Sequence, residues 1–253
     1  MSISIAPVLT TPFVLYQSPR LNAYADRLIH GFSGKPLSLG GAALSREEKS
    51  QNRALLARQL GMAARPVLAP NQVHGCQIWT SASESLLCTG EADAMLVKES
   101  YLPVMILTAD CVPIILYSPN AHAGLVIHSG WRGTALNIAG HAVNTLHEES
   151  GAPNGGMIAA IGPAIGPCCY EVSVEVAEKV CRTVAMDISP FCRFNSESSN
   201  PRLDLVAVIK AQLQQAGVTT IDNLSGCTVC HPDLFFSHRR GDTGRQGAIL
   251  QLL

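Results

Sequence analysis

Four β-rich apolar segments follow one another with very short breaks in the middle of the chain. They are ADAMLV (92–97), PVMILTAD (103–110), VPIILYS (112–118) and AGLVIHS (123–129). A strand with one solvent-facing side alternates polar and apolar residues, whereas these segments are almost continuously apolar. Such runs are typical of strands that are buried on both faces. The sequence therefore predicts a β-sheet whose two faces are both covered by other elements.

Helices are predicted on either side of this strand region. Ser45 and Glu48 form a capping box at the start of a helix that ends at Gly61. A further helix is expected over residues 134–151, with Thr134 as its cap. The two remaining predicted helices have apolar residues at three- and four-residue spacing and cover residues 173–185 and 202–217.

The chain shows no fixed-period repeat, no low-complexity tract and no clear linker. Residues 1–29 are weakly patterned and are interpreted as an N-terminal lead-in. The Gly-, Ser- and Pro-rich segment 30–41 is interpreted as a loop. We therefore expect the α+β fold class, as a single catalytic domain over residues 30–253 with mixed β-sheets flanked by helices.

Composition and charge exclude several classes of protein. The net charge of −1 gives no overall attraction to nucleic acid or to anionic membranes. No run of 18 or more apolar residues is present, and no lysine or arginine precedes Arg20, so neither a membrane span nor a secretory signal is predicted. Nine cysteines in 253 residues do not resemble a small disulfide scaffold. We expect a cytoplasmic protein with reduced thiols that acts on a small molecule, and the sequence leaves its oligomeric state open.

Three short motifs each place one nitrogen or sulfur ligand at the end of an apolar run. They are NQVHG with His74, TADCVPI with Cys111 and HSGWRGT with His128. Two imidazoles and a thiolate suit zinc, and three protein ligands with one open position are the pattern of catalytic zinc. Asp110, next to Cys111, is a carboxylate in an apolar run and needs a partner if it is buried. All four residues are candidates for the catalytic site.

More ordinary explanations exist for residues of these types. A histidine in an apolar run is often a hydrogen-bonded core residue, which is how we interpret His122, His141 and His147. Cys111 taken alone would be a buried small hydrophobe. These alternatives stay open for each residue considered by itself.

Two further features lie near the C-terminus. CTVCH (227–231) matches the pattern of c-type haem attachment, which usually belongs outside the cytoplasm. No second C-x-x-C is available for a zinc site, and the adjacent pair Cys168–Cys169 is sterically awkward for that use, so CTVCH is assigned a structural or incidental role. Arg239, Arg240 and Arg245 lie among glycines in SHRRGDTGR. They can hold phosphate or carboxylate, or form a solvated turn.

Taken together and in order, the motifs of this chain resemble one family. They are HGFSGK, NQVHG, ADAMLV, TADCVPI, HSGWRGT, IGPAIGPCCYEV, LDL and CTVC…FFSHRR…TGR. From about residue 30 to residue 245, the chain is similar to the YfiH-like family. Members of that family are described as laccase-domain or polyphenol oxidase proteins, as purine nucleoside phosphorylases and as peptidoglycan editing factors.

The resemblance implies a mixed α/β fold in one domain, with one zinc ion per chain held by His74, Cys111 and His128. It also implies phosphorolysis of adenosine, inosine and methylthioadenosine, and deamination of adenosine. Substrate contacts are then expected from Arg53, Gln72, Arg239 and Arg240. One departure is Lys35, which stands where the family often has a Ser-Thr-Arg sequence after the phenylalanine of its first motif. This change affects a loop expected near the substrate.

Three other functions are compatible with the same residues, two of them enzymatic. A Cys111–His128 dyad without metal would suit a cysteine-type amidohydrolase that edits peptidoglycan precursors. Copper in place of zinc would suit a polyphenol oxidase, although the chain has eight histidines and no His-X-His pair to hold a copper cluster. A binding module with a structural metal would need a fourth ligand near the first three, from Cys227, Cys230 or His231.

Overall fold

The computed structural model describes residues 13–253 except 63–64, 81–89, 196–197 and 225. Its helices are α1 (Pro19–Asn22), α2 (Arg46–Gln59), α3 (Trp131–Ala135), α4 (Ile138–Ser150), α5 (Val174–Cys181) and α6 (Leu205–Gln215), with a 3-10 turn at Asn154–Gly156. Its strands are β1 (Leu15–Tyr16), β2 (Leu28–Ser33), β3 (Ile78–Thr80), β4 (Ala94–Val97), β5 (Val104–Thr108), β6 (Val112–Ser118), β7 (Ala123–Ser129), β8 (Ile158–Ile161), β9 (Cys192–Asn195), β10 (Ser198–Leu203), β11 (Thr220–Asn223) and β12 (Gln246–Leu252). The expected α+β architecture with mixed sheets is confirmed.

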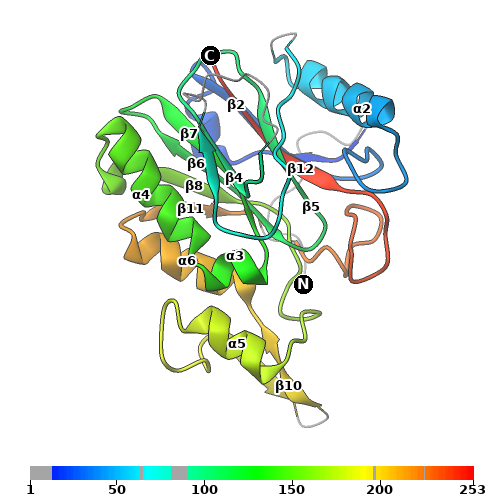
Figure 1. The fold of residues 1–253 in the computed structure, drawn as a ribbon, viewed down its shortest axis with the longest axis vertical. Coiled ribbons are helices and arrows are strands. Elements are labelled where there is room, and N and C mark those ends of the chain that lie inside the picture. The colour runs from blue at the N-terminus through cyan, green and yellow to red at the C-terminus, as the bar shows by residue number, and fades with distance from the viewer. Residues whose placement is uncertain (1–12, 63–64, 81–89, 196–197, 225) are drawn as a thin grey trace.

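Two sheets form the centre of the described structure (Figure 1). The larger has the order β11-β8-β6-β7-β4-β3, and the smaller has the order β1-β2-β12-β5. Strands β6 and β7 are buried along their whole length, as the continuous apolar runs predict. Strands β9 and β10 form a separate antiparallel pair.

Alternating side chains of β6 enter two different cores. Ile114 and Leu116 pack with residues of α4 and α6 on one face of the larger sheet. Ile115 and Tyr117 pack against residues of the smaller sheet on the other face. Helix α2 packs on the far side of the smaller sheet through Leu56. The larger sheet is therefore covered by helices on one face and by a second sheet on the other.

Two local predictions need correction. Thr134 does not cap a helix over 134–151, because it lies inside α3, where its hydroxyl donates to the carbonyl of the N-cap residue Gly130. Asn137, with φ of 56°, caps α4 instead by accepting a hydrogen bond from the N–H of Gly140. Residues 30–33 are not part of a loop, since they belong to β2, which pairs with β12 on one side and with β1 on the other. The capping box at the start of α2 is confirmed.

Residues 13–29 contribute directly to the core. Tyr16 and Leu21 are fully buried, and both belong to the apolar cluster between the two sheets. The boundary at residue 29 stays a prediction, because residues 1–12 lie outside the described part of the chain. Among the described helices, none has the length and apolar character needed to cross a membrane.

His30 makes the stability of this core sensitive to acid. Burial lowers its pKa from 6.5 to about 4, against an opposing effect of the charge on Asp222. Its Nε2 accepts a hydrogen bond of 2.8 Å from the backbone N–H of Ser18, which requires the neutral ring. Between pH 6.5 and 4 the unfolded state binds more protons than the folded state, so stability falls as the pH falls. From pH 7 to pH 5 we expect this residue to contribute a loss of about 2 kcal/mol.

Urea denaturation at the two pH values measures this contribution. His30→Gln retains a hydrogen-bond acceptor but does not titrate, so its loss of stability should be smaller than that of the wild type. An equal loss in the two proteins would show that His30 is not responsible.

Candidate metal and catalytic site

His74, Cys111 and His128 converge at one end of the larger sheet. Cys111 lies in the short turn where the chain leaves β5 in the smaller sheet and enters β6 in the larger one. His128 lies at the end of the neighbouring β7, and His74 lies in the loop before β3. One ligand atom from each of the three residues lies within 4.8 Å of the other two. This group is called the triad below.

Asp93 holds two members of the triad in place. Its carboxylate accepts hydrogen bonds from the backbone N–H groups of His74 (2.9 Å) and Gly75 (2.6 Å). It also lies 2.7 Å from Nδ1 of His128, which leaves Nε2 of that ring for Cys111 or a metal. The Asp93 side chain is completely buried. Sequence reasoning missed Asp93, although an acid inside the apolar run ADAMLV was the available signal.

The charges of Cys111 and His128 depend on each other. Burial by itself would raise the pKa of the Cys111 thiol, but hydrogen bonds and charge from His128 and His74 lower it to about 6. Burial would lower the pKa of His128, but Asp93 and Cys111 raise it to about 9. Near neutral pH this pair is therefore a thiolate beside an imidazolium.

The backbone around the triad adopts uncommon conformations. His74 and Asp110 have φ angles of 62° and 86°, a region that non-glycine residues rarely occupy. Asp110 is held by its own contacts. Its carboxylate accepts hydrogen bonds from the hydroxyls of Thr228 (2.6 Å) and Ser237 (3.1 Å) and from the N–H of Arg239 (2.7 Å). These bonds attach the turn that carries Cys111 to the segment between β11 and β12, which is called the C-terminal loop below.

Gly130 allows the triad to close. A Cβ atom at this position would lie 2.9 Å from Sγ of Cys111 and 3.1 Å from Cδ2 of His74. We therefore expect Gly130→Ala to displace both candidate ligands and to lower the affinity of the triad for an added metal ion by at least about 10-fold, as changes around metal ligands commonly do. Competition with a chelator measures this. Gly155→Ala is the control, since nothing lies within 4 Å of the added Cβ. Equal affinity in the two variants would contradict the close approach.

Two cavities meet at the triad. The larger, of about 440 Å³, is bordered by His74, Cys111 and Asp110 and also by Trp131, Arg132, Tyr170, His238 and Arg239. The smaller, of about 330 Å³, is bordered by all three triad residues together with Gln72, His238 and Arg245. Both volumes suit a small-molecule ligand. His238 borders both cavities, whereas sequence reasoning named only the arginines of that segment.

The predicted substrate-binding residues occupy four different surroundings. Arg239 borders the larger cavity, where it packs over Tyr170 and donates to two backbone carbonyls. Gln72 borders the smaller cavity, but both ends of its amide bond the backbone of Leu107. Arg53 borders a third cavity that contains no triad residue, and it donates to the carbonyl of Leu39.

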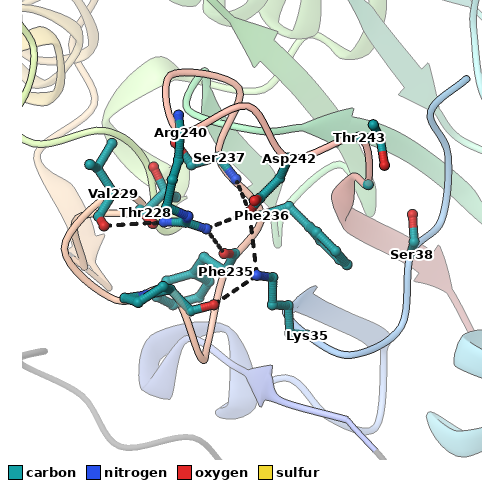
Figure 2. Close-up of polar contacts among 12 residues, drawn as sticks. Lys35, Ser38, Thr228, Val229, Phe235, Phe236, Ser237, Arg240, Asp242 and Thr243 are labelled. Carbon is teal, nitrogen blue, oxygen red and sulfur yellow. Dashed lines mark hydrogen bonds and ion pairs between the residues drawn. The ribbon is translucent and has the colours of Figure 1, made fainter. Parts of the chain in front are cut away.

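Arg240 and Lys35 belong to a network that shapes the C-terminal loop (Figure 2). The guanidinium of Arg240 donates to the carbonyls of Thr228 and Phe235 and pairs with Asp242. Lys35 pairs with the same carboxylate at 3.3 Å and donates to the carbonyl of Pro232. Neither side chain borders the two cavities at the triad.

Comparison with known proteins identifies the family. A family model described as multi-copper polyphenol oxidoreductase laccase matches residues 38–253. The chain belongs to this laccase family. Purine nucleoside phosphorylase YlmD of Geobacillus stearothermophilus is 34% identical over 217 residues, which are 81% of this chain and 79% of YlmD. Purine nucleoside phosphorylase LACC1 of Homo sapiens is 28% identical over 235 residues, which are 85% of this chain and 53% of that longer protein.

A solved structure agrees with this assignment. The crystal structure of YlmD from Geobacillus stearothermophilus superposes with a TM-score of 0.86 at 29% identity and covers 98% of both chains. The resemblance to the YfiH-like family is confirmed. The laccase family is described by copper chemistry, whereas the curated relatives are named for nucleoside phosphorolysis, so the family assignment does not by itself select the metal or the reaction.

Proposed function

We propose that this chain is a zinc-dependent purine nucleoside phosphorylase. Its substrates would be adenosine, inosine and methylthioadenosine, and it would also deaminate adenosine. The observation that carries the proposal is the triad, which opens into a cavity bordered by two aromatic rings and two arginines. The names of the relatives support the class of reaction, which is group transfer from a nucleoside to phosphate.

The triad fits a single zinc ion. It offers two imidazoles and one thiolate, which is the number of protein ligands in catalytic zinc sites, and His74 and Cys111 border the larger cavity. Asp93 fixes the ring of His128 through Nδ1, as the outer partners of metal-bound histidines do. When bound, zinc would supply a Lewis acid and lower the pKa of water.

The residues around the larger cavity would bind and orient the substrate. The rings of Trp131 and Tyr170 offer flat apolar surfaces for a purine. Burial, together with the charges of Cys111 and Asp110, raises the pKa of Tyr170 to about 12, so its hydroxyl stays protonated and can donate a hydrogen bond. Arg132 and Arg239 would hold phosphate close to C1′ of the ribose. Asp110, with three hydrogen-bond donors around its carboxylate, is better suited to positioning than to donating a proton.

Product analysis with adenosine tests the proposal. With phosphate present, we expect adenine and ribose 1-phosphate; without phosphate, adenine release should stop while inosine from deamination continues. Failure to release any purine base from adenosine, inosine or methylthioadenosine, in protein that carries its metal, would overturn the proposal.

A pair of arginine variants tests the location of the phosphate. We expect Arg239→Met to raise the KM for phosphate at least about 10-fold, because a hydrogen bond to a charged group contributes about 1.5–3 kcal/mol. Arg53→Met is the matched control, since Arg53 borders a different cavity. A rise in KM in Arg53→Met alone would move the phosphate site to that cavity.

One observation favours a second candidate function. The thiolate–imidazolium state of Cys111 and His128 is also the resting state of a cysteine nucleophile. A cysteine-type amidohydrolase that edits peptidoglycan precursors would use this pair without metal. Activity on amide substrates that survives complete removal of metal would favour this candidate over the phosphorylase.

A further inference from the structure

Four cysteines that are far apart in the sequence form a second cluster of thiols. Cys168 and Cys169 come from the turn after β8, and Cys227 and Cys230 come from CTVC after β11. Sγ of Cys230 lies 3.5 Å from Sγ of Cys168 and 3.4 Å from Sγ of Cys169, and all four sulfur atoms lie within 4.8 Å of one another. The prediction that the adjacent pair is sterically unsuited to join CTVC is therefore wrong, because the turn at 166–170 presents both thiols to it.

Backbone contacts hold the two segments of this cluster together. Ala164 and Cys227 form a parallel bridge that joins the two segments. The backbone N–H of Gly166 donates to Sγ of Cys227 at 3.3 Å, and the N–H groups of Val229 and Cys230 also bond this sulfur. Three N–H donors directed at one sulfur are outer partners of the kind that orient a metal ligand.

We propose that Cys168, Cys169, Cys227 and Cys230 bind one zinc ion as a closed, structural site. Four thiolates around zinc, with bonds of about 2.3 Å in a tetrahedron, place the sulfur atoms about 3.8 Å apart. The separations in the cluster are of this size. Binding exchanges the thiol protons for the ion and involves no change in oxidation state.

A disulfide would engage only two of the four thiols, whereas one metal ion would engage all four. A disulfide requires two sulfur atoms about 2.05 Å apart and leaves the other two thiols of the cluster without a role. A single ion satisfies all four, and the exposed Cys230 provides access for it. Iron–sulfur clusters are also held by four cysteines, but their several irons spread the thiolates further apart than the cluster shows.

The proposed site would fix the position of residues that line one side of the larger cavity at the triad. Tyr170 follows Cys169 directly and borders that cavity, and Arg239 donates to the carbonyl of Cys169. On the other segment, Thr228 lies inside CTVC and donates to Asp110, next to Cys111. Zinc at the four cysteines would therefore hold both segments in register without touching the substrate.

Metal analysis in a variant without the triad tests this site independently of the proposed function. The full-length variant His74→Ala/Cys111→Ser lacks two of the three triad ligands and retains all four cysteines of the cluster. We expect it to retain one zinc per chain after purification, and X-ray absorption at the zinc edge should show four sulfur neighbours at about 2.3 Å. Absence of zinc, or nitrogen and oxygen neighbours around it, would overturn the proposal.

A second pair of variants locates the ion. Cys230→Ser in the otherwise unchanged chain removes one proposed ligand at an exposed position, and the folded protein should bind one zinc fewer per chain than the wild type. Cys192→Ala is the control, because Cys192 is outside both clusters and should leave the zinc content unchanged. Equal zinc content in Cys230→Ser and the wild type would contradict the assignment.

Discussion

Cys111→Ser is expected to reduce phosphorolysis by more than about 100-fold. The substitution exchanges a soft thiolate, which zinc binds strongly, for a neutral hydroxyl. Changes to residues that merely orient metal ligands already cost 10–100-fold in affinity or activity, so loss of a ligand itself should cost more. Metal content and the rate of purine release are measured on the same sample.

Cys76→Ser is the matched control for this variant. Cys76 lies two residues from His74 but belongs to neither group of candidate ligands among the described residues. It should keep the activity and metal content of the wild type. Near-normal activity in Cys111→Ser would contradict the central role of the triad. Loss of activity with no change in metal content would identify Cys111 as a nucleophile instead.

Asp93→Asn is expected to weaken the site in two ways. The new amide carries no charge to pair with His128, and its NH2 group faces backbone N–H donors where an acceptor is needed. We expect zinc affinity to fall 10–100-fold, as for other partners of metal-bound histidines. Disrupting a buried charged pair should also cost roughly 3 kcal/mol of folding stability.

A chelator titration and a urea denaturation curve separate these effects. Asp187→Asn is the control, because Asp187 is on the surface and bonds only Ser189 among the described contacts. If Asp93→Asn loses stability but binds zinc as tightly as the wild type, Asp93 supports the fold alone and does not position His128.

The central strands were predictable because their signal is local. The four segments between residues 92 and 129 are almost continuously apolar, and this pattern alone indicates strands covered on both faces. The division into two sheets was not predictable, since β5 and β6 are separated by only three residues and still belong to different sheets. The left-handed conformation of Asp110 turns the chain there, and the residue type does not reveal it.

The same distinction applies to the site. His74, Cys111 and His128 were found because each ends an apolar run, which is visible along the sequence. The four-cysteine cluster was not found because it depends on a contact between segments about 60 residues apart. Arg53 and Arg240 were predicted to contact substrate, and in the structure both donate to backbone carbonyls. The sequence could not show these bonds, because an arginine among glycines or on a helix has the same sequence pattern whether it binds a ligand or a backbone carbonyl.

Anomalous X-ray diffraction from crystals of catalytically active protein tests the central claim most directly. Data collected above and below the zinc absorption edge locate zinc and distinguish it from copper. We predict a zinc peak about 2.0–2.3 Å from Sγ of Cys111, Nε2 of His128 and a ring nitrogen of His74. Active crystals with no metal at this position, or with a peak that persists below the zinc edge as copper would give, would contradict the account.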